Sequence, residues 1–79
     1  MNTLNDQYEA AQATFDVLCA KSNEKRDHHR ALRLEMKTHP TPENIRAEES
    51  ARIARRDAIR AASDASVALL KISIERARR

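Results

Sequence analysis

Two long stretches of the chain repeat mostly apolar residues in steps of three and four, which is the spacing of one face of an α-helix. In the first stretch these positions are Leu4, Tyr8, Ala11, Phe15, Leu18, Ser22, Lys25, His29, Leu32 and Met36. In the second stretch they are Ala47, Ala51, Ala54, Ala58, Ala61, Ala65, Ala68 and Ile72. The pattern predicts one helix over about residues 3–38 and another over about residues 42–77.

The segment KTHPTPEN, residues 37–44, separates the two stretches and contains both prolines of the chain. Proline disfavours the α conformation in the residue before it, so this segment predicts a turn over about residues 38–42. The start of the second helix has a typical order of residues. Thr41 can serve as the N-cap and Pro42 as the first helical residue, and Glu43 places a negative charge near the positive end of the helix dipole. The sequence therefore predicts an all-α fold, an antiparallel two-helix hairpin of coiled-coil type.

Folding the chain at the prolines pairs residues whose numbers sum to about 80. Phe15 then faces Ala65, and Leu18 faces Ala61. Alanines allow two helix backbones to approach closely and to receive larger side chains from the opposite helix. We therefore expect a close, alanine-lined contact between the helices.

A second set of large apolar residues falls on the other side of the second helix. This set, called the outer stripe below, consists of Ile45, Ile59, Val67, Leu70 and Ile74. A helix that is apolar on two sides needs cover on both, and a hairpin covers only one. We expect a second copy, in a homodimer of four helices, or another protein to cover the stripe. The alternative is that these residues are scattered surface apolar residues, which are common.

Composition supports long helices, because the 79 residues include no glycine, two prolines and 34% charged residues. The single cysteine cannot form an internal disulfide, and no run of eighteen apolar residues or signal-peptide layout occurs. We expect one small domain over residues 1–79, in the cytoplasm and not in a membrane. A core of this size rarely stabilises a fold by more than about 3–5 kcal/mol, which also favours association.

Lys25 and His29 occupy mid-helix positions where apolar residues would be expected. Polar residues there usually fix the register of a helix pair or reach to its edge, and the alternative for His29 is a pH-sensitive contact. His28 points about 100° away from His29, and Cys19 lies more than two turns away, so no set of convergent metal ligands is expected.

Catalysis needs a concave site with positioned groups, which a hairpin with one short turn does not offer. We therefore expect no enzyme, catalytic residue, cofactor, metal or small-molecule substrate.

Basic residues concentrate in the half of the hairpin next to the turn, although the net charge is only +3. Four of those in the second helix lie close together, namely Arg52, Arg55, Arg56 and Arg60. These arginines could contact phosphates or an acidic protein partner. Glu48, Glu49 and Asp57 lie among them at helical spacings and would pair with them, and aromatic residues for base stacking are absent.

In architecture alone the chain resembles three unrelated classes of small helical hairpin. These are plasmid-type RNA-binding hairpins, secretion co-chaperones, and small phage or mobile-element proteins that bind and redirect a host machine. Such a resemblance concerns fold, and function has to come from the surface residues. We expect a non-enzymatic protein-binding hairpin, homodimeric, that acts as an adaptor, inhibitor or assembly factor. The alternative is an RNA- or DNA-binding hairpin that uses its arginine-rich half.

Overall fold

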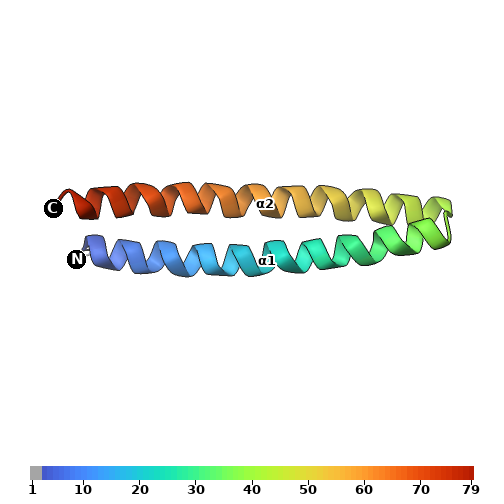
Figure 1. Ribbon diagram of the computed structural model, residues 1–79, viewed down its shortest axis with the longest axis horizontal. Helices are drawn as coiled ribbons and strands as arrows, with labels where there is room; N and C mark the ends of the chain where they lie inside the picture. Colours follow the sequence, from blue (N-terminus) through green and yellow to red (C-terminus); the bar gives the residue numbers. More distant parts are fainter. Residues whose placement is uncertain (1–2) are drawn as a thin grey trace.

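Two antiparallel helices make up the computed structural model, which describes residues 3–79 (Figure 1). Helix α1 spans Leu4–Thr38, helix α2 spans Pro42–Ala77, and residues 39–41 connect them. The helices lie side by side along their whole length, with the start of α1 and the end of α2 together at one end. The predicted all-α hairpin is therefore confirmed.

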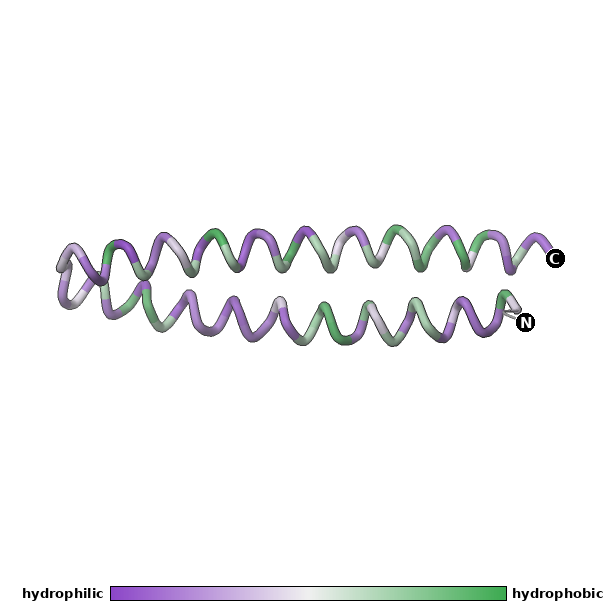
Figure 2. The backbone as a smooth tube through the Cα atoms, turned by 180° about the vertical axis from the view of Figure 1, so that it is seen from behind, coloured by the Kyte–Doolittle hydropathy of each residue, from purple (hydrophilic) through white to green (hydrophobic). Residues whose placement is uncertain are grey.

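Hydrophilic and hydrophobic residues alternate along both helices (Figure 2). This alternation follows from the step of three or four between apolar positions, which returns an apolar side chain to the same face once per turn. Within residues 3–79, neither helix contains a stretch that is long and apolar enough to cross a bilayer.

The inner faces of the two helices, where α1 and α2 contact each other, follow the predicted positions closely. All ten predicted positions of α1 are half-buried or buried, as are seven of the eight in α2. The prediction for Ala68 was wrong, because Ala68 is exposed and Leu69 is half-buried in its place. An α-helix has 3.6 residues per turn, so a strict seven-residue repeat drifts by about 20° per repeat, and near Ala68 this drift turns Leu69 toward α1, while the next predicted position, Ile72, is half-buried.

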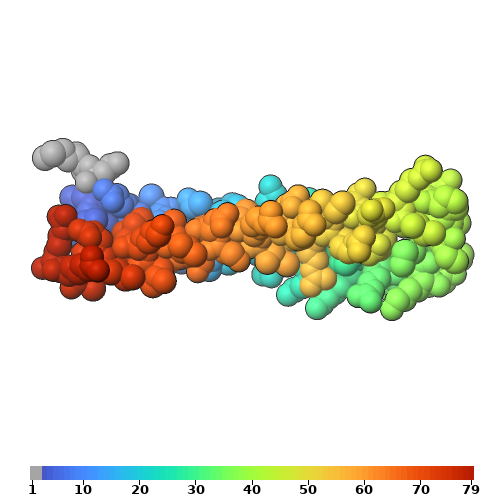
Figure 3. All heavy atoms as spheres, turned by 90° about the horizontal axis from the view of Figure 1, so that it is seen from above, coloured from blue at the N-terminus to red at the C-terminus, as the bar shows by residue number. Residues whose placement is uncertain are grey.

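The interior between the helices is thin. Only Ala51 and His29 are buried among the described residues, each 5% exposed, and no large side chain is fully buried. The molecule is a rod of 57 × 16 × 14 Å (Figure 3). Its accessible surface is 6007 Å², about 1,100 Å² more than a compact monomer of its mass exposes. One hairpin therefore does not enclose a hydrophobic core.

Each helix begins with a threonine cap. The hydroxyl of Thr3 accepts a hydrogen bond from the amide of Asp6 at 3.1 Å, and the Asp6 carboxylate accepts one from the Thr3 amide at 3.3 Å. At the start of α2 the hydroxyl of Thr41 accepts a hydrogen bond from the amide of Asn44 at 3.2 Å, with Pro42 in the first turn. These bonds satisfy amide groups that have no partner inside the helix.

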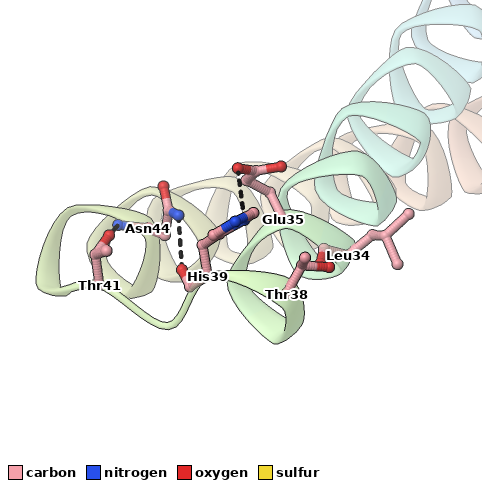
Figure 4. A network of polar contacts seen from close by, with 6 residues as sticks. All are labelled: Leu34, Glu35, Thr38, His39, Thr41 and Asn44. Carbon is pink, nitrogen blue, oxygen red and sulfur yellow. Dashed lines mark hydrogen bonds and ion pairs between the residues drawn. The ribbon is translucent and has the colours of Figure 1, made fainter.

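The turn between the helices is held by polar contacts instead of a glycine (Figure 4). The side-chain amide of Asn44 donates to the carbonyl of His39 at 2.7 Å, and the amide of His39 donates to the carbonyl of Glu35 at 2.8 Å. The hydroxyl of Thr38 donates to the carbonyl of Leu34 at 3.0 Å. No residue in the described range has a positive φ, so the chain reverses without the left-handed conformation that usually requires glycine.

We predict that Ala65→Leu lowers the free energy of unfolding by about 1–3 kcal/mol, because the added methyl groups force the helices apart. Ala61→Leu, also at the inner face, should behave in the same way. Ala68→Leu is the matched control, since Ala68 is exposed on the same helix. Urea unfolding followed by circular dichroism measures the three effects. Equal stability of all three variants and the parent would contradict the observed inner face.

Candidate functional site

A buried polar cluster joins the two helices in the half of the hairpin next to the turn. The imidazole Nε2 of His29 in α1 lies 2.9 Å from Oε1 of Glu48 in α2. Its Nδ1 lies 3.3 Å from Nη1 of Arg55, about two turns further along α2. The side chains of His29 and Glu48 are only 6% and 15% exposed.

The geometry assigns the tautomer of His29. A guanidinium group can only donate hydrogen bonds, so Nδ1 of His29 accepts from Arg55. The ring proton is then on Nε2, which donates to the Glu48 carboxylate. The neutral imidazole thus satisfies both contacts, whereas an imidazolium would direct a second N–H at the cationic Arg55. In residues 3–79 no buried side-chain nitrogen or oxygen lacks a hydrogen-bond partner.

The cluster also affects the acidity of Glu48. The hydrogen bond from His29 lowers the pKa of Glu48 below the usual glutamate value. Burial acts in the opposite direction, and the positive charge of Arg52 adds to the lowering of this pKa. Glu48 is consequently ionised at neutral pH, and its carboxylate accepts the hydrogen bond from Nε2 of His29.

Contacts at two places along the hairpin fix its register. The His29 cluster links α1 to Glu48 and Arg55, and near the open end the guanidinium carbon of Arg76 lies 3.9 Å from the centre of the Tyr8 ring. In each pair the residue numbers sum to within about four of the predicted value of 80. These contacts favour the interpretation of His29 as a residue that fixes the register of the helix pair. Glu48 was missed as its partner, although this pairing rule places Glu48 within one turn of the expected position.

The four arginines singled out in the sequence do not form one surface. Arg55 is half-buried and points to His29, whereas Arg52, Arg56 and Arg60 are exposed. Arg56 lies 3.7 Å from the carboxylate of Asp57 in an exposed contact. In the described range no ion pair involves Arg52 or Arg60. The expected pairing of these arginines with neighbouring acids is therefore largely absent.

All five residues of the outer stripe, namely Ile45, Ile59, Val67, Leu70 and Ile74, are exposed. Their exposed fractions lie between 45% and 59%. The stripe is on the side of α2 that faces away from α1, because the residues of the inner face are half-buried or buried. Near its middle, Ile59 lines an open hollow together with Arg52 and Arg56 and with His29 and Arg55 of the buried cluster. At Ile59 the apolar stripe therefore adjoins the exposed arginines of α2.

No protein-family model, curated protein or solved structure matches the chain. Residues 3–79 contain no group of three or more histidine, cysteine, aspartate or glutamate side chains that could hold a metal ion. Two surface features of α2 remain as candidate binding sites, namely the outer stripe and the exposed arginines.

We predict that Glu48→Gln destabilises the hairpin at neutral pH and that this difference from the parent disappears in acid. A carboxyl group whose pKa is lowered by folding contributes stability above its unfolded pKa, and loses it as the pH falls through the lowered folded value. The difference should therefore shrink below the usual glutamate pKa of about 4.3. Thermal unfolding between neutral pH and pH 3 measures it.

Glu49→Gln is the control for this experiment, because it removes the same charge from an exposed neighbouring side chain. A Glu48→Gln variant that unfolds like the parent at neutral pH would show that the cluster contributes nothing to the hairpin.

Proposed function

We propose that this protein is a non-enzymatic binding hairpin that associates with protein through the outer stripe of α2, first of all with a second copy of itself. In this role it acts as an adaptor, inhibitor or assembly factor. The observation that carries the proposal is the position of the large aliphatic residues. Val67 and Leu70 are 51% and 59% exposed, while no large side chain is fully buried between the helices.

The exposed area supports the same proposal. A typical stable interface buries about 800 Å² on each partner. The hairpin exposes about 1,100 Å² beyond the expectation for a compact monomer, so one such contact would bring it close to a normal surface area. Because the two helices do not enclose a core, association would supply buried apolar surface that folding alone leaves in water.

An adaptor needs a second contact besides self-association, and the exposed arginines offer one. Arg52 and Arg56 lie in the half of α2 next to the turn, whereas Val67, Leu70 and Ile74 lie in the other half. Cationic side chains of this kind complement an acidic protein surface. The half-buried free thiol of Cys19 is in keeping with a reducing, cytoplasmic setting for such a protein.

Binding of RNA or DNA is the second candidate function. Exposed Arg52 and Arg60, which form no ion pair within residues 3–79, favour it. The aromatic residues do not favour nucleic-acid binding, because Phe15 is half-buried and the Tyr8 ring is in contact with the Arg76 guanidinium, so neither ring is free to stack on a base. The two candidates differ in salt dependence, since each phosphate contact adds about one unit to the log–log slope.

We predict that Val67→Lys combined with Leu70→Lys converts the associated protein to a monomer, because two ammonium groups cannot be buried unpaired. Light scattering measures the mass in solution. Asn23→Lys combined with Ala31→Lys is the matched control, which adds the same charge at exposed positions of α1 and should leave the mass unchanged. A parent chain that is already a stable monomer, with no protein partner lost in the double variant, would contradict the proposal.

A further inference from the structure

We infer that the second copy lies antiparallel along α2, with the two Val67 residues facing each other at the centre of the contact. This inference rests on the self-association proposed above and adds its orientation and register. It follows from the order of apolar, charged and small side chains around the outer stripe.

The apolar residues of the stripe complement each other in this orientation. When two antiparallel copies of α2 are centred on Val67, facing residues have numbers that sum to about 134. Ile59 then faces Ile74 of the second copy, and the small Ser63 faces the large Leu70. The two-fold axis repeats each contact, so four exposed isoleucines and two exposed leucines become covered together.

Charged residues along one edge of the stripe favour the same register. Arg60, Asp64 and Lys71 are exposed on this edge, and Glu75 is partly exposed beside Arg79. In an antiparallel helix pair the same edges of the two copies meet. At a sum of about 134, Arg60 faces Glu75 of the second copy and Asp64 faces Lys71, so every contact joins opposite charges.

A parallel arrangement would remove these contacts. In a parallel two-fold pair opposite edges of the two helices meet, so the edge with Arg60 and Asp64 would lie beside the edge of the second copy that carries Ala62 and Ser66. Charged residues at the edges of a helix pair set its orientation, and here they find opposite charges only in the antiparallel pair. The charge order along α2 therefore selects the antiparallel orientation.

The opposite edge of the stripe has small side chains, which lets the second helix approach. Ala62, Ser66 and Ser73 lie along it. The hydroxyl of Ser73 donates to the carbonyl of Leu69 in its own helix at 3.0 Å, so covering it leaves no unpaired donor. The contact thus has a charged edge that sets the register and a small edge that allows close packing.

The register also determines what remains outside the contact. Facing pairs centred on Val67 involve about residues 57–77, so the turn-proximal half of each hairpin extends beyond the second copy. Arg52 and Arg56 of the two copies are then displayed at opposite ends of the dimer, and Ile45 stays uncovered. A dimer of this form presents two identical basic ends, which suits an adaptor that joins two acidic partners.

Disulfide crosslinking between single-cysteine variants of the full chain tests the orientation. Cys19→Ala removes the native thiol, and Ile59→Cys or Ile74→Cys is added to separate preparations. We expect each variant alone to stay reduced under mild oxidation. An equal mixture of the two should form a disulfide dimer between position 59 of one chain and position 74 of the other.

Light scattering of each variant before oxidation separates the failure of this inference from the failure of the proposed function. Dimers in which Ile59→Cys crosslinks to itself would show a parallel contact and would overturn the antiparallel register. A dimeric mixture that forms no disulfide between positions 59 and 74 would overturn it as well. A parent chain that is monomeric by light scattering would overturn both the register and the self-association on which it rests.

Discussion

The small size of the side chains on the inner face of α2 is the constraint on which the rest of the structure depends. Alanines such as Ala51, Ala58 and Ala65 let α1 approach closely, but each contributes little apolar area to the contact. Between the helices only Ala51 and His29 are buried in the described part of the chain. Leu69 and Ile72 are half-buried on the inner face, but the five large aliphatic side chains of the outer stripe are exposed, so the hairpin exposes residues that would normally form a core.

A contact built from repeated alanines specifies its register weakly, because a shift by one repeat again places alanine opposite a similar neighbour. The buried cluster removes this ambiguity. His29 can meet Glu48 and Arg55 together at only one alignment of the helices, with contacts of 2.9 and 3.3 Å. Other alignments would leave buried polar groups without partners, which is costly in an apolar contact. Packing thus brings the helices together, and hydrogen bonding fixes how they align.

Much of the fold could be predicted from the sequence, because the two prolines and the regular spacing of apolar residues leave few alternatives. The error at Ala68 came from extending a seven-residue repeat along a helix that follows its natural 3.6-residue period. The candidate site was less predictable. The exposure of Val67 and Leu70 followed from periodicity. The contact of Arg55 with His29 did not, because Arg55 could also pair with nearby acidic side chains, and the spacing of residues along the chain does not determine which partner it takes.

The hairpin does not enclose a core of its own, and we propose that a second copy completes it. Sedimentation equilibrium combined with thermal unfolding at protein concentrations spanning about two orders of magnitude tests this most directly, since a dimer that dissociates on unfolding becomes more stable as its concentration rises. We expect a mass of twice 9.0 kDa and a melting temperature that increases with concentration. A mass of 9.0 kDa with a melting temperature independent of concentration would contradict it.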